Sequence, residues 1–287
     1  MKNTFGSDLS LTIFGESHGR AIGAVLDGMA AGVPVDEAFV AACMDKRRAR
    51  GDGLSTPRTE ADAVQFLSGV VNGYTTGTAI ALMVENQNTR SADYAKTADL
   101  LRPGHADYTA YAKYHGFQDA RGGGHFSGRV TAALVAGGAV VLGALSRAGI
   151  DISTHIAACA GISDTRFALD DAAALAAQVE ALAGKPEGFA VLDPAVEEPM
   201  KAAIRAAGAD GDSVGGLLET AILGLPAGIG EPYFDSVESK IAHLAFSIPA
   251  VKGIEFGTGF DFSGLRGSEA NDAFRMTPEG AVVTASN

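Results

Sequence analysis

The stretch Leu9-Ser10-Leu11-Thr12-Ile13-Phe14-Gly15-Glu16-Ser17-His18-Gly19 decides how the first part of the chain folds. Its first five residues alternate between apolar and polar, which is the period-two pattern of a strand with one buried face. The strand runs directly into a turn with a glycine at either end, and glycine adopts the backbone angles that tight turns need. His18 is therefore predicted to be presented from a turn at the end of a strand. An imidazole in such a position can give or take a proton near neutral pH.

A second histidine lies in a similar turn, within Arg102-Pro103-Gly104-His105-Ala106-Asp107. A single histidine in a turn is more often structural than catalytic, but two such turns favour a shared chemical role. Cations also gather between them, and they are Lys46, Arg47, Arg48, Arg50 and Arg58. Guanidinium groups beside histidines predict a ligand that carries phosphate or carboxylate.

The remaining pattern predicts an α+β chain built on antiparallel sheets, because short turns join neighbouring strands. Further strands are predicted at 22–26, 64–71 and 78–85, and helices at 36–46, 108–114, 130–148, 170–183, 194–207 and 234–246. Residues 86–107 form a long loop, of the kind that often carries function. The segments 26–34 and 223–232 each read as strand, glycine turn and helix. This echo is either a coincidence in a glycine-rich chain or a sign of two related halves.

The composition bounds the class of protein. With 287 residues, of which 47% are hydrophobic and 20% charged, the chain can bury a large core. No low-complexity linker divides it, which favours a single domain with two halves. The net charge of −12 argues against general nucleic-acid binding but still allows a small anionic ligand at a local cluster of cations.

The cysteines, the N-terminus and the apolar runs indicate the cellular compartment in which the protein is expected. Cys43 and Cys159 are isolated in the sequence, so neither a disulfide framework nor a zinc site is expected. The N-terminus has no signal-peptide core. The longest apolar run, 132–145, has 14 residues with three glycines and is too short to cross a bilayer, so we expect a buried helix. A cytoplasmic protein without membrane contacts is predicted.

The triple glycine at 122–124 allows two interpretations. It is either a tight turn or an anion cradle at the start of a helix, and Arg121 and Arg129 on either side favour the cradle. It is not a P-loop, because no Gly-Lys-Ser/Thr follows, and the dinucleotide fingerprint is also missing.

The turn at 15–19 also fits the G-x-S-x-G pattern of a hydrolase elbow, with Ser17 as nucleophile and His243 as a possible base. That elbow needs a helix directly after it, whereas residues 21–26 predict a strand. The four other histidines, at 115, 125, 155 and 243, show no metal-ligand spacing, and no metal is predicted.

Taken together, several segments closely resemble the chorismate synthase family, and the resemblance spans nearly the whole chain. They are 14–19 (FGESHG), 27–34, 47–48, 75–78 (TTGT), 102–108 (RPGHADY), 121–129 (RGGGHFSGR), 211–216 (GDSVGG), 226–232 (PAGIGEP), 250–257 and 266–272 (RGSEAND). The resemblance implies a β-α-β sandwich, with helices between two antiparallel sheets and two pseudo-repeated halves. It also implies a homotetramer.

The resemblance further implies a reaction. A chorismate synthase is a carbon-oxygen lyase that acts on a phosphate. It eliminates phosphate from 5-enolpyruvylshikimate 3-phosphate, in an anti-1,4 sense, to give chorismate for aromatic amino acid biosynthesis. Reduced FMN is required although no net redox change occurs. With no extra domain visible, NADPH is expected to act only indirectly, through an external flavin reductase. The substrate carries two carboxylates and a phosphate, which agrees with the arginines noted above.

Roles follow from the same resemblance. His18 would protonate the departing phosphate, and His105 would give a proton to the edge of the reduced flavin. Expected flavin-binding residues are His125, Phe126, Ser127, Glu269, Ala270 and Arg47, and expected substrate-binding residues are Ser17, Arg47, Arg48, Arg58, Arg102 and Arg129. The family has an arginine where this chain has His125, and a second one where it has Gly53.

The last departure lies at the end of the chain. After Ser286-Asn287 the family continues into a segment with an Arg-His-Asp-Pro motif, which is absent from these 287 residues. The aspartate of that motif is thought to help the flavin act as a base. We therefore expect a chorismate synthase domain over 1–287 that lacks this segment and has little activity by itself. The non-enzymatic alternative is a flavin- or anion-binding protein with the same fold.

Overall fold

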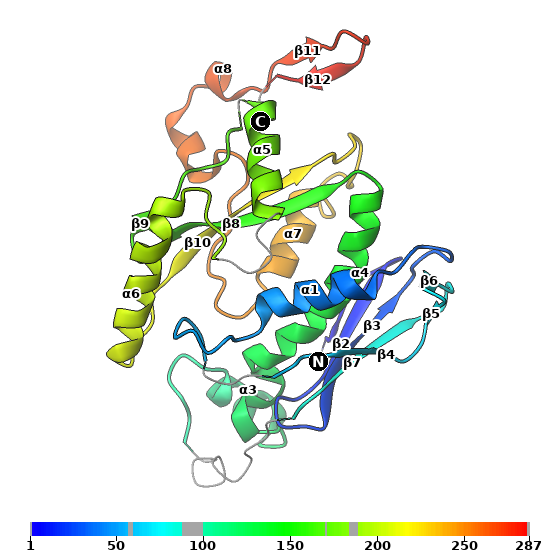
Figure 1. Ribbon diagram of the computed structural model, residues 1–287, viewed down its shortest axis with the longest axis vertical. Helices are drawn as coiled ribbons and strands as arrows, with labels where there is room; N and C mark the ends of the chain where they lie inside the picture. The colour runs from blue at the N-terminus through cyan, green and yellow to red at the C-terminus, as the bar shows by residue number, and fades with distance from the viewer. Residues whose placement is uncertain (1, 57–59, 88–99, 170, 184–188, 286–287) are drawn as a thin grey trace. The chain divides into compact units, whose positions relative to one another are not determined.

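A computed structural model describes residues 2–56, 60–87, 100–169, 171–183 and 189–285. The chain divides into two compact units, Met1–Ile150 and Asp151–Asn287. Each unit combines antiparallel strands with helices (Figure 1), so the α+β class predicted from the sequence is confirmed. The single domain over 1–287 stays a prediction.

The first unit is built on a five-stranded antiparallel sheet with the order β1-β2-β3-β7-β4. Its strands are β1 (Thr4–Gly6), β2 (Ser10–Gly15), β3 (Ala21–Asp27), β4 (Val64–Phe66) and β7 (Ile80–Glu85). The strand predicted before the first histidine turn is β2, and it pairs with β3 as expected, with Ile13 opposite Ala24. The turn between these two strands carries His18 at one end of the sheet.

The strands predicted at 64–71 and 78–85 are present, and a small hairpin lies between them. β4 pairs with β7, while β5 (Val70–Val71) and β6 (Tyr74–Thr75) form a separate two-stranded hairpin between them. Asn72 and Gly73 both have positive φ, at 52° and 78°, as a two-residue hairpin loop requires. Asn72 and Gly73 therefore close the short hairpin, while the predicted strands at 64–71 and 78–85 pair through β4 and β7.

Helix α4 (Thr131–Arg147) packs on the sheet of the first unit, and helix α1 (Glu37–Arg47) packs against α4. Asp36 caps α1, near the start of the helix predicted at 36–46, by accepting a hydrogen bond from the backbone N–H of Phe39 at 3.0 Å. Small residues of α4 are buried against the strands and α1, and the core joins Ile22, Leu26, Val40, Met44, Ile80, Leu82, Val84, Ala132, Ala136 and Val140. The helix α3 (Asp107–Tyr114) follows the second histidine turn.

The apolar run at 132–145, which predicts a buried helix, lies within α4. By length and hydropathy alone, Gly128–Arg147 could cross a membrane. In the structure its inner face packs on α1, β2, β3 and β7. It is thus a core helix of the first unit.

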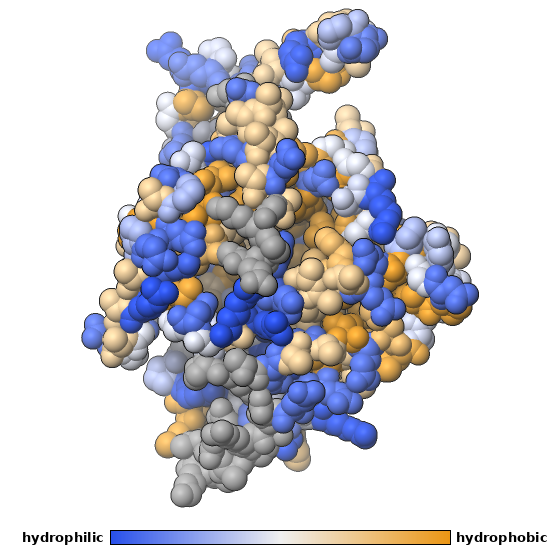
Figure 2. All heavy atoms as spheres, viewed as in Figure 1, coloured by the Kyte–Doolittle hydropathy of each residue, from blue (hydrophilic) through white to orange (hydrophobic). Residues whose placement is uncertain are grey.

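The second unit has a three-stranded sheet of order β10-β8-β9, with β8 (Asp151–Cys159), β9 (Ile162–Ser163) and β10 (Gly216–Leu223). Its helices are α5 (Ala172–Ala183), α6 (Glu197–Ala209), α7 (Val237–Ala245) and α8 (Gly267–Ala270), with short 3₁₀ turns at η3 (Pro194–Val196) and η4 (Gly259–Gly264) and a last hairpin of β11 (Phe274–Met276) and β12 (Val282–Thr284). The alanine-rich α5 buries Leu175 and Leu182, and Figure 2 shows a pale orange, moderately hydrophobic surface over this helix.

The echo between residues 26–34 and 223–232 has a counterpart in the structure. β3 leads through a glycine-bearing loop to α1, and β10 leads through another to α7. Each of the two segments therefore joins a strand to a helix through a glycine-bearing loop, as the sequence predicted for it.

Candidate functional site

The turn that carries His18 is buried although both of its central residues are polar. Ser17 is fully buried and His18 is 5% exposed. Asn86, which follows β7, donates from its Nδ2 atom to the backbone carbonyls of Glu16 and Gly19, each at 2.9 Å. The turn is therefore clamped from the neighbouring strand of the sheet, which restricts the positions that the His18 ring can take.

The triple glycine lies directly against this turn. It belongs to the 3₁₀ segment η1 (Arg121–Phe126), in which Gly122, Gly123 and Gly124 all have positive φ. The backbone N–H of Ser17 donates to the Gly124 carbonyl at 3.0 Å, and the Ser17 hydroxyl donates to the Arg121 carbonyl at 3.3 Å. The two segments, more than 100 residues apart in sequence, therefore form one unit of structure.

The two histidines lie against consecutive glycines. A Cβ atom placed on Gly122 would be 2.3 Å from His18 Nε2, and one placed on Gly123 would be 3.0 Å from His105 Nε2. The His18 ring therefore approaches the backbone more closely than a side chain at 122 would allow, and the His105 ring leaves only tight room for one at 123. The prediction that His18 and His105 share one site agrees with this placement.

His105 belongs to a hydrogen-bonded group at the start of α3. Its Nδ1 atom lies 2.6 Å from Asp107 Oδ1. Arg102 donates to both oxygens of the same carboxylate, from Nε at 2.8 Å and from Nη2 at 2.8 Å, and its backbone N–H adds a third bond at 3.0 Å. The Arg102 guanidinium and this backbone bond hold the pKa of Asp107 well below its usual range.

A second acid faces His18. Asp119 accepts two hydrogen bonds from the Arg121 guanidinium, at 2.8 and 2.7 Å. The Arg121 bonds lower the pKa of Asp119, and the nearby His18 lowers it further. Each histidine thus has an ionised carboxylate near it.

Two of the predicted anion-binding arginines meet at a buried acid. Asp62, on the loop before β4, contacts Arg47 from α1 with one oxygen and Arg129 from η2 (Gly128–Val130) with the other. Glu60 lies 2.9 Å from Arg129, and Asn86 accepts from the Arg129 Nε atom at 3.2 Å. Burial lowers the pKa of Arg47, while Asp62 opposes that change. Because Asn86 also clamps the His18 turn, this cluster of cations borders the histidine site.

The predicted flavin-binding tripeptide closes η1. His125 donates from Nδ1 to the Gly15 carbonyl at 2.7 Å, and the Phe126 ring stacks on Tyr114 with ring centres 6.2 Å apart. Ser127 accepts from the backbone N–H of Arg129 and lies close to Gly123. The three residues therefore flank the histidine site from the same loop.

The other predicted site residues belong to other elements of the chain. Arg48 pairs with the exposed Asp45 at the end of α1, at 3.0 Å. Glu269 and Ala270 belong to α8 of the second unit, where Glu269 accepts from the backbone N–H of Arg266. Arg58 lies outside the described residues.

Sequence reasoning did not single out Asp62, Asn86 or Asp119 as site residues. Asp119 lies two residues before Arg121, so its pairing was visible as a local charge pattern. Asp62 and Asn86 meet Arg129 only through the sheet and give no local signal.

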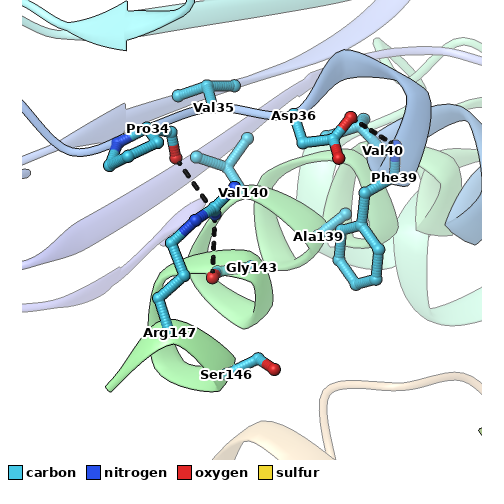
Figure 3. A pocket seen from close by; sticks show the side chains of 10 residues that line it. All are labelled: Pro34, Val35, Asp36, Phe39, Val40, Ala139, Val140, Gly143, Ser146 and Arg147. Carbon is cyan, nitrogen blue, oxygen red and sulfur yellow. Dashed lines mark hydrogen bonds between the residues drawn. The ribbon is translucent and has the colours of Figure 1, made fainter. Parts of the chain in front are cut away.

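A separate cavity of about 260 Å³ lies between α1 and α4. Figure 3 shows Arg147 reaching across its mouth to the Pro34 carbonyl, at 3.3 Å, with Phe39 on the opposite wall. Its lining includes none of the residues predicted for the site. We assign it no part in the chemistry described below.

The arrangement has a definable chemistry. Two imidazoles, each near an ionised carboxylate, lie beside guanidinium groups on an α+β scaffold. This combination is typical of enzymes that bind anionic substrates and move protons on them.

Comparisons with known proteins agree with that class. The sequence model of the family described as chorismate synthase matches residues 9–287. The chorismate synthase of Korarchaeum cryptofilum is 43% identical over 272 residues, which are 95% of this chain and 73% of the relative. That of Methanosarcina mazei is 42% identical over 99% of this chain and 75% of its own length. A crystal structure of chorismate synthase superimposes with a TM-score of 0.77 at 28% identity, and covers 97% of this chain and 76% of its own. The chain therefore belongs to the chorismate synthase family, whose members are lyases of the shikimate pathway.

Proposed function

We propose that the site built on His18 and His105 eliminates phosphate from 5-enolpyruvylshikimate 3-phosphate to form chorismate. The observation that carries this proposal is the placement of two imidazoles on consecutive glycines, beside clustered arginines. An elimination of this kind breaks a carbon-oxygen bond to phosphate and removes a proton from a carbon. It therefore needs an acid near the leaving group and groups that stabilise negative charge.

His18 is the proposed acid toward the departing phosphate. It is buried at 5% exposure, it comes from a clamped turn, and the ionised Asp119 lies near it. A proton passes from an imidazole nitrogen to a phosphate oxygen, and the ring is left neutral. General acid assistance of this kind is worth about 10²- to 10⁴-fold in rate.

The residues around His105 fit a reduced flavin. A reduced flavin carries negative charge along one edge of its ring system, and that edge needs hydrogen-bond donors. His105 can present Nε2 as such a donor, while Ser127 and the aromatic pair of Phe126 and Tyr114 lie on the adjoining loop and helix. When bound, reduced FMN would supply transient electron density for loss of phosphate. His105 would hold a proton at Nε2, and Ser127 and Phe126 would help orient the ring.

Arg47 and Arg129 are the proposed partners of the substrate anions. Their guanidinium groups share Asp62 in this structure, so substrate would bind next to an arginine pair that is already aligned. Arg48, Arg58, Arg102, Glu269 and Ala270 remain proposed binding residues from the family resemblance alone.

The finer setting is also part of the proposal. The protein would work in the cytoplasm as a homotetramer, with reduced FMN supplied by an external, NADPH-dependent reductase. No nucleic acid or membrane is expected to take part, because the net charge is −12 and the apolar helix α4 packs in the core of its unit.

The proposal is tested by an anaerobic assay with 5-enolpyruvylshikimate 3-phosphate and reduced FMN, with chorismate as the measured product. We expect slow but measurable formation of chorismate by residues 1–287 without net consumption of flavin, and a further loss of about 10²- to 10⁴-fold in His18→Ala. Absence of chorismate from a folded protein that still binds reduced FMN would overturn the proposed reaction and favour the binding-only alternative.

The same assay separates the hydrolase alternative. β3 follows the Ser17 turn where a nucleophile elbow needs a helix, which already disfavours that alternative. Ser17→Ala should retain part of its turnover because His18 remains, whereas a hydrolase would lose essentially all of it. Low activity of residues 1–287 by themselves stays a prediction, and turnover comparable to that of a full-length relative would contradict it.

A further inference from the structure

We infer that Asp107 is a positioning residue that selects which nitrogen of His105 carries the proton in the neutral ring. This inference deepens the proposed function and rests on it, because it concerns the same site. It starts from the 2.6 Å distance between His105 Nδ1 and Asp107 Oδ1, which is short for a hydrogen bond between a ring nitrogen and a carboxylate.

The direction of this hydrogen bond follows from the charge on Asp107. Three hydrogen bonds from Arg102 converge on its carboxylate, whose pKa lies well below its usual range. An ionised carboxylate only accepts hydrogen bonds, so Nδ1 must carry the hydrogen. Arg102 Nη2 also lies 3.3 Å from Nδ1, but a guanidinium only donates, and Nδ1 cannot accept from it while donating to Asp107. The shorter contact, to the ionised oxygen, decides the tautomer.

The other end of the ring then becomes the chemically available one. Nε2 faces Gly123, where a Cβ atom would lie only 3.0 Å away. With Nδ1 protonated, the neutral ring presents a lone pair at Nε2, and the charged ring presents an N–H there. A proton leaves Nε2 for an anionic acceptor and the ring returns to its Nδ1–H form. Asp107 gives up no proton in this step and stabilises the charged ring.

Asp107 has a second, purely structural contact that the experiment must separate. It is the first residue of α3, and its bonds to Arg102 close the turn that precedes this helix. A structural role would be lost equally when Arg102 is removed. A positioning role is lost only when the carboxylate itself is removed.

The experiment measures the ¹⁵N chemical shifts of the His105 ring in the folded protein at neutral pH, with His105→Ala used to assign the signals. We expect the Nδ1–H form in the wild type. In Asp107→Ala the signal should move toward the Nε2–H form, while in Arg102→Ala the Nδ1–H form should persist. Asp107→Glu should recover the wild-type form if its longer carboxylate reaches Nδ1.

Turnover gives the second readout. Asp107→Ala should lower kcat by roughly 10- to 100-fold, with a much smaller change in KM, since the variant removes a partner of the proton donor and not a contact to substrate. An unchanged His105 tautomer in Asp107→Ala would overturn the inference. If Asp107→Ala does not fold, Asp107→Asn takes its place: its amide can also donate, so a mixture of tautomers is expected, and a pure Nδ1–H signal would count against the inference.

These outcomes are distinguishable from failure of the proposed function. The tautomer is read without substrate or flavin, so it is defined even for a protein that makes no chorismate. A wild type that fails to form chorismate contradicts the proposed reaction, whereas an active wild type with an insensitive tautomer contradicts only the role of Asp107.

Discussion

The His18 and His105 rings lie against adjacent residues of one loop, His18 against Gly122 and His105 against Gly123. The glycines therefore do more than allow a turn. Each leaves room for one imidazole, at a position where any side chain would overlap the ring or press on it. This relationship allows each histidine to be displaced separately without being replaced.

Gly122→Ala should displace His18. The added Cβ atom would lie 2.3 Å from Nε2, closer than any real contact, so the ring must move. If His18 is the acid, kcat should fall by about 10²- to 10⁴-fold, close to the loss in His18→Ala. Turnover and the ¹H resonances of the two imidazoles are the measurements, and only those of His18 should shift strongly.

Gly123→Ala should act on His105 and more mildly, because its Cβ atom would lie 3.0 Å from Nε2. A matched control is Gly149→Ala, which has a similar positive φ of 81° but open space around it. All three variants carry a backbone strain of about 1–2 kcal/mol, so the control isolates the effect of the contact. Equal turnover in Gly122→Ala and Gly149→Ala would show that the position of the His18 ring against Gly122 does not affect catalysis.

Local patterns account for much of the fold. The alternation at 9–13 predicts β2, Asp36 predicts the start of α1, and the Asn72-Gly73 pair predicts a hairpin loop. Each of these depends on residues a few positions apart, where side-chain period and backbone angles act directly. The predicted strands at 64–71 and 78–85 do pair, through β4 and β7, but the small hairpin of β5 and β6 between them was not predicted.

The site could be predicted from the sequence only where its residues are close together in the chain. The motif 102–107 contains both His105 and the acid that holds it, so that group was visible in the sequence. The meeting of Arg47 and Arg129 at Asp62 joins residues from a helix, a loop and a 3₁₀ turn, and only the folded sheet brings them together. A pattern along the chain cannot reveal such a contact, because its partners have no common spacing.

Asp62→Asn should destabilise the first unit. The carboxylate lies between two guanidinium groups, and its side chain is 2% exposed, so its neutralisation leaves Arg47 and Arg129 facing each other with less compensation. We expect a loss of roughly 3 kcal/mol, at the lower end for buried pairs because Arg47 still reaches solvent. Urea unfolding measures this loss. Asp45→Asn removes an exposed partner of Arg48 and serves as the control, with a change of less than about 1 kcal/mol. Equal losses in the two variants would argue against a buried charge network.

Asp164 should make the stability of the second unit depend on pH. Its side chain is buried, which by itself raises the pKa of the carboxyl group. Three groups form hydrogen bonds with its charged form: the backbone N–H groups of Leu192 at 2.7 Å and Asp193 at 2.8 Å, and the His155 ring at 2.8 Å. These bonds lower the pKa of Asp164 below its usual value. A carboxyl group whose pKa is lower in the folded state stabilises that state at pH values above its unfolded pKa of about 3.9. The contribution is lost as the pH falls through the folded pKa.

Asp164→Asn removes this contribution at every pH. The free energy of unfolding should therefore drop by about 2–3 kcal/mol at pH 7, since bonds to a charged group are replaced. The difference between wild type and variant should shrink as the pH is lowered from 5 toward 2, because the wild type loses the same charge there. Urea unfolding at pH 7 and pH 3 provides the comparison. A difference that stays constant between these two pH values would mean that Asp164 is not held ionised by its three partners.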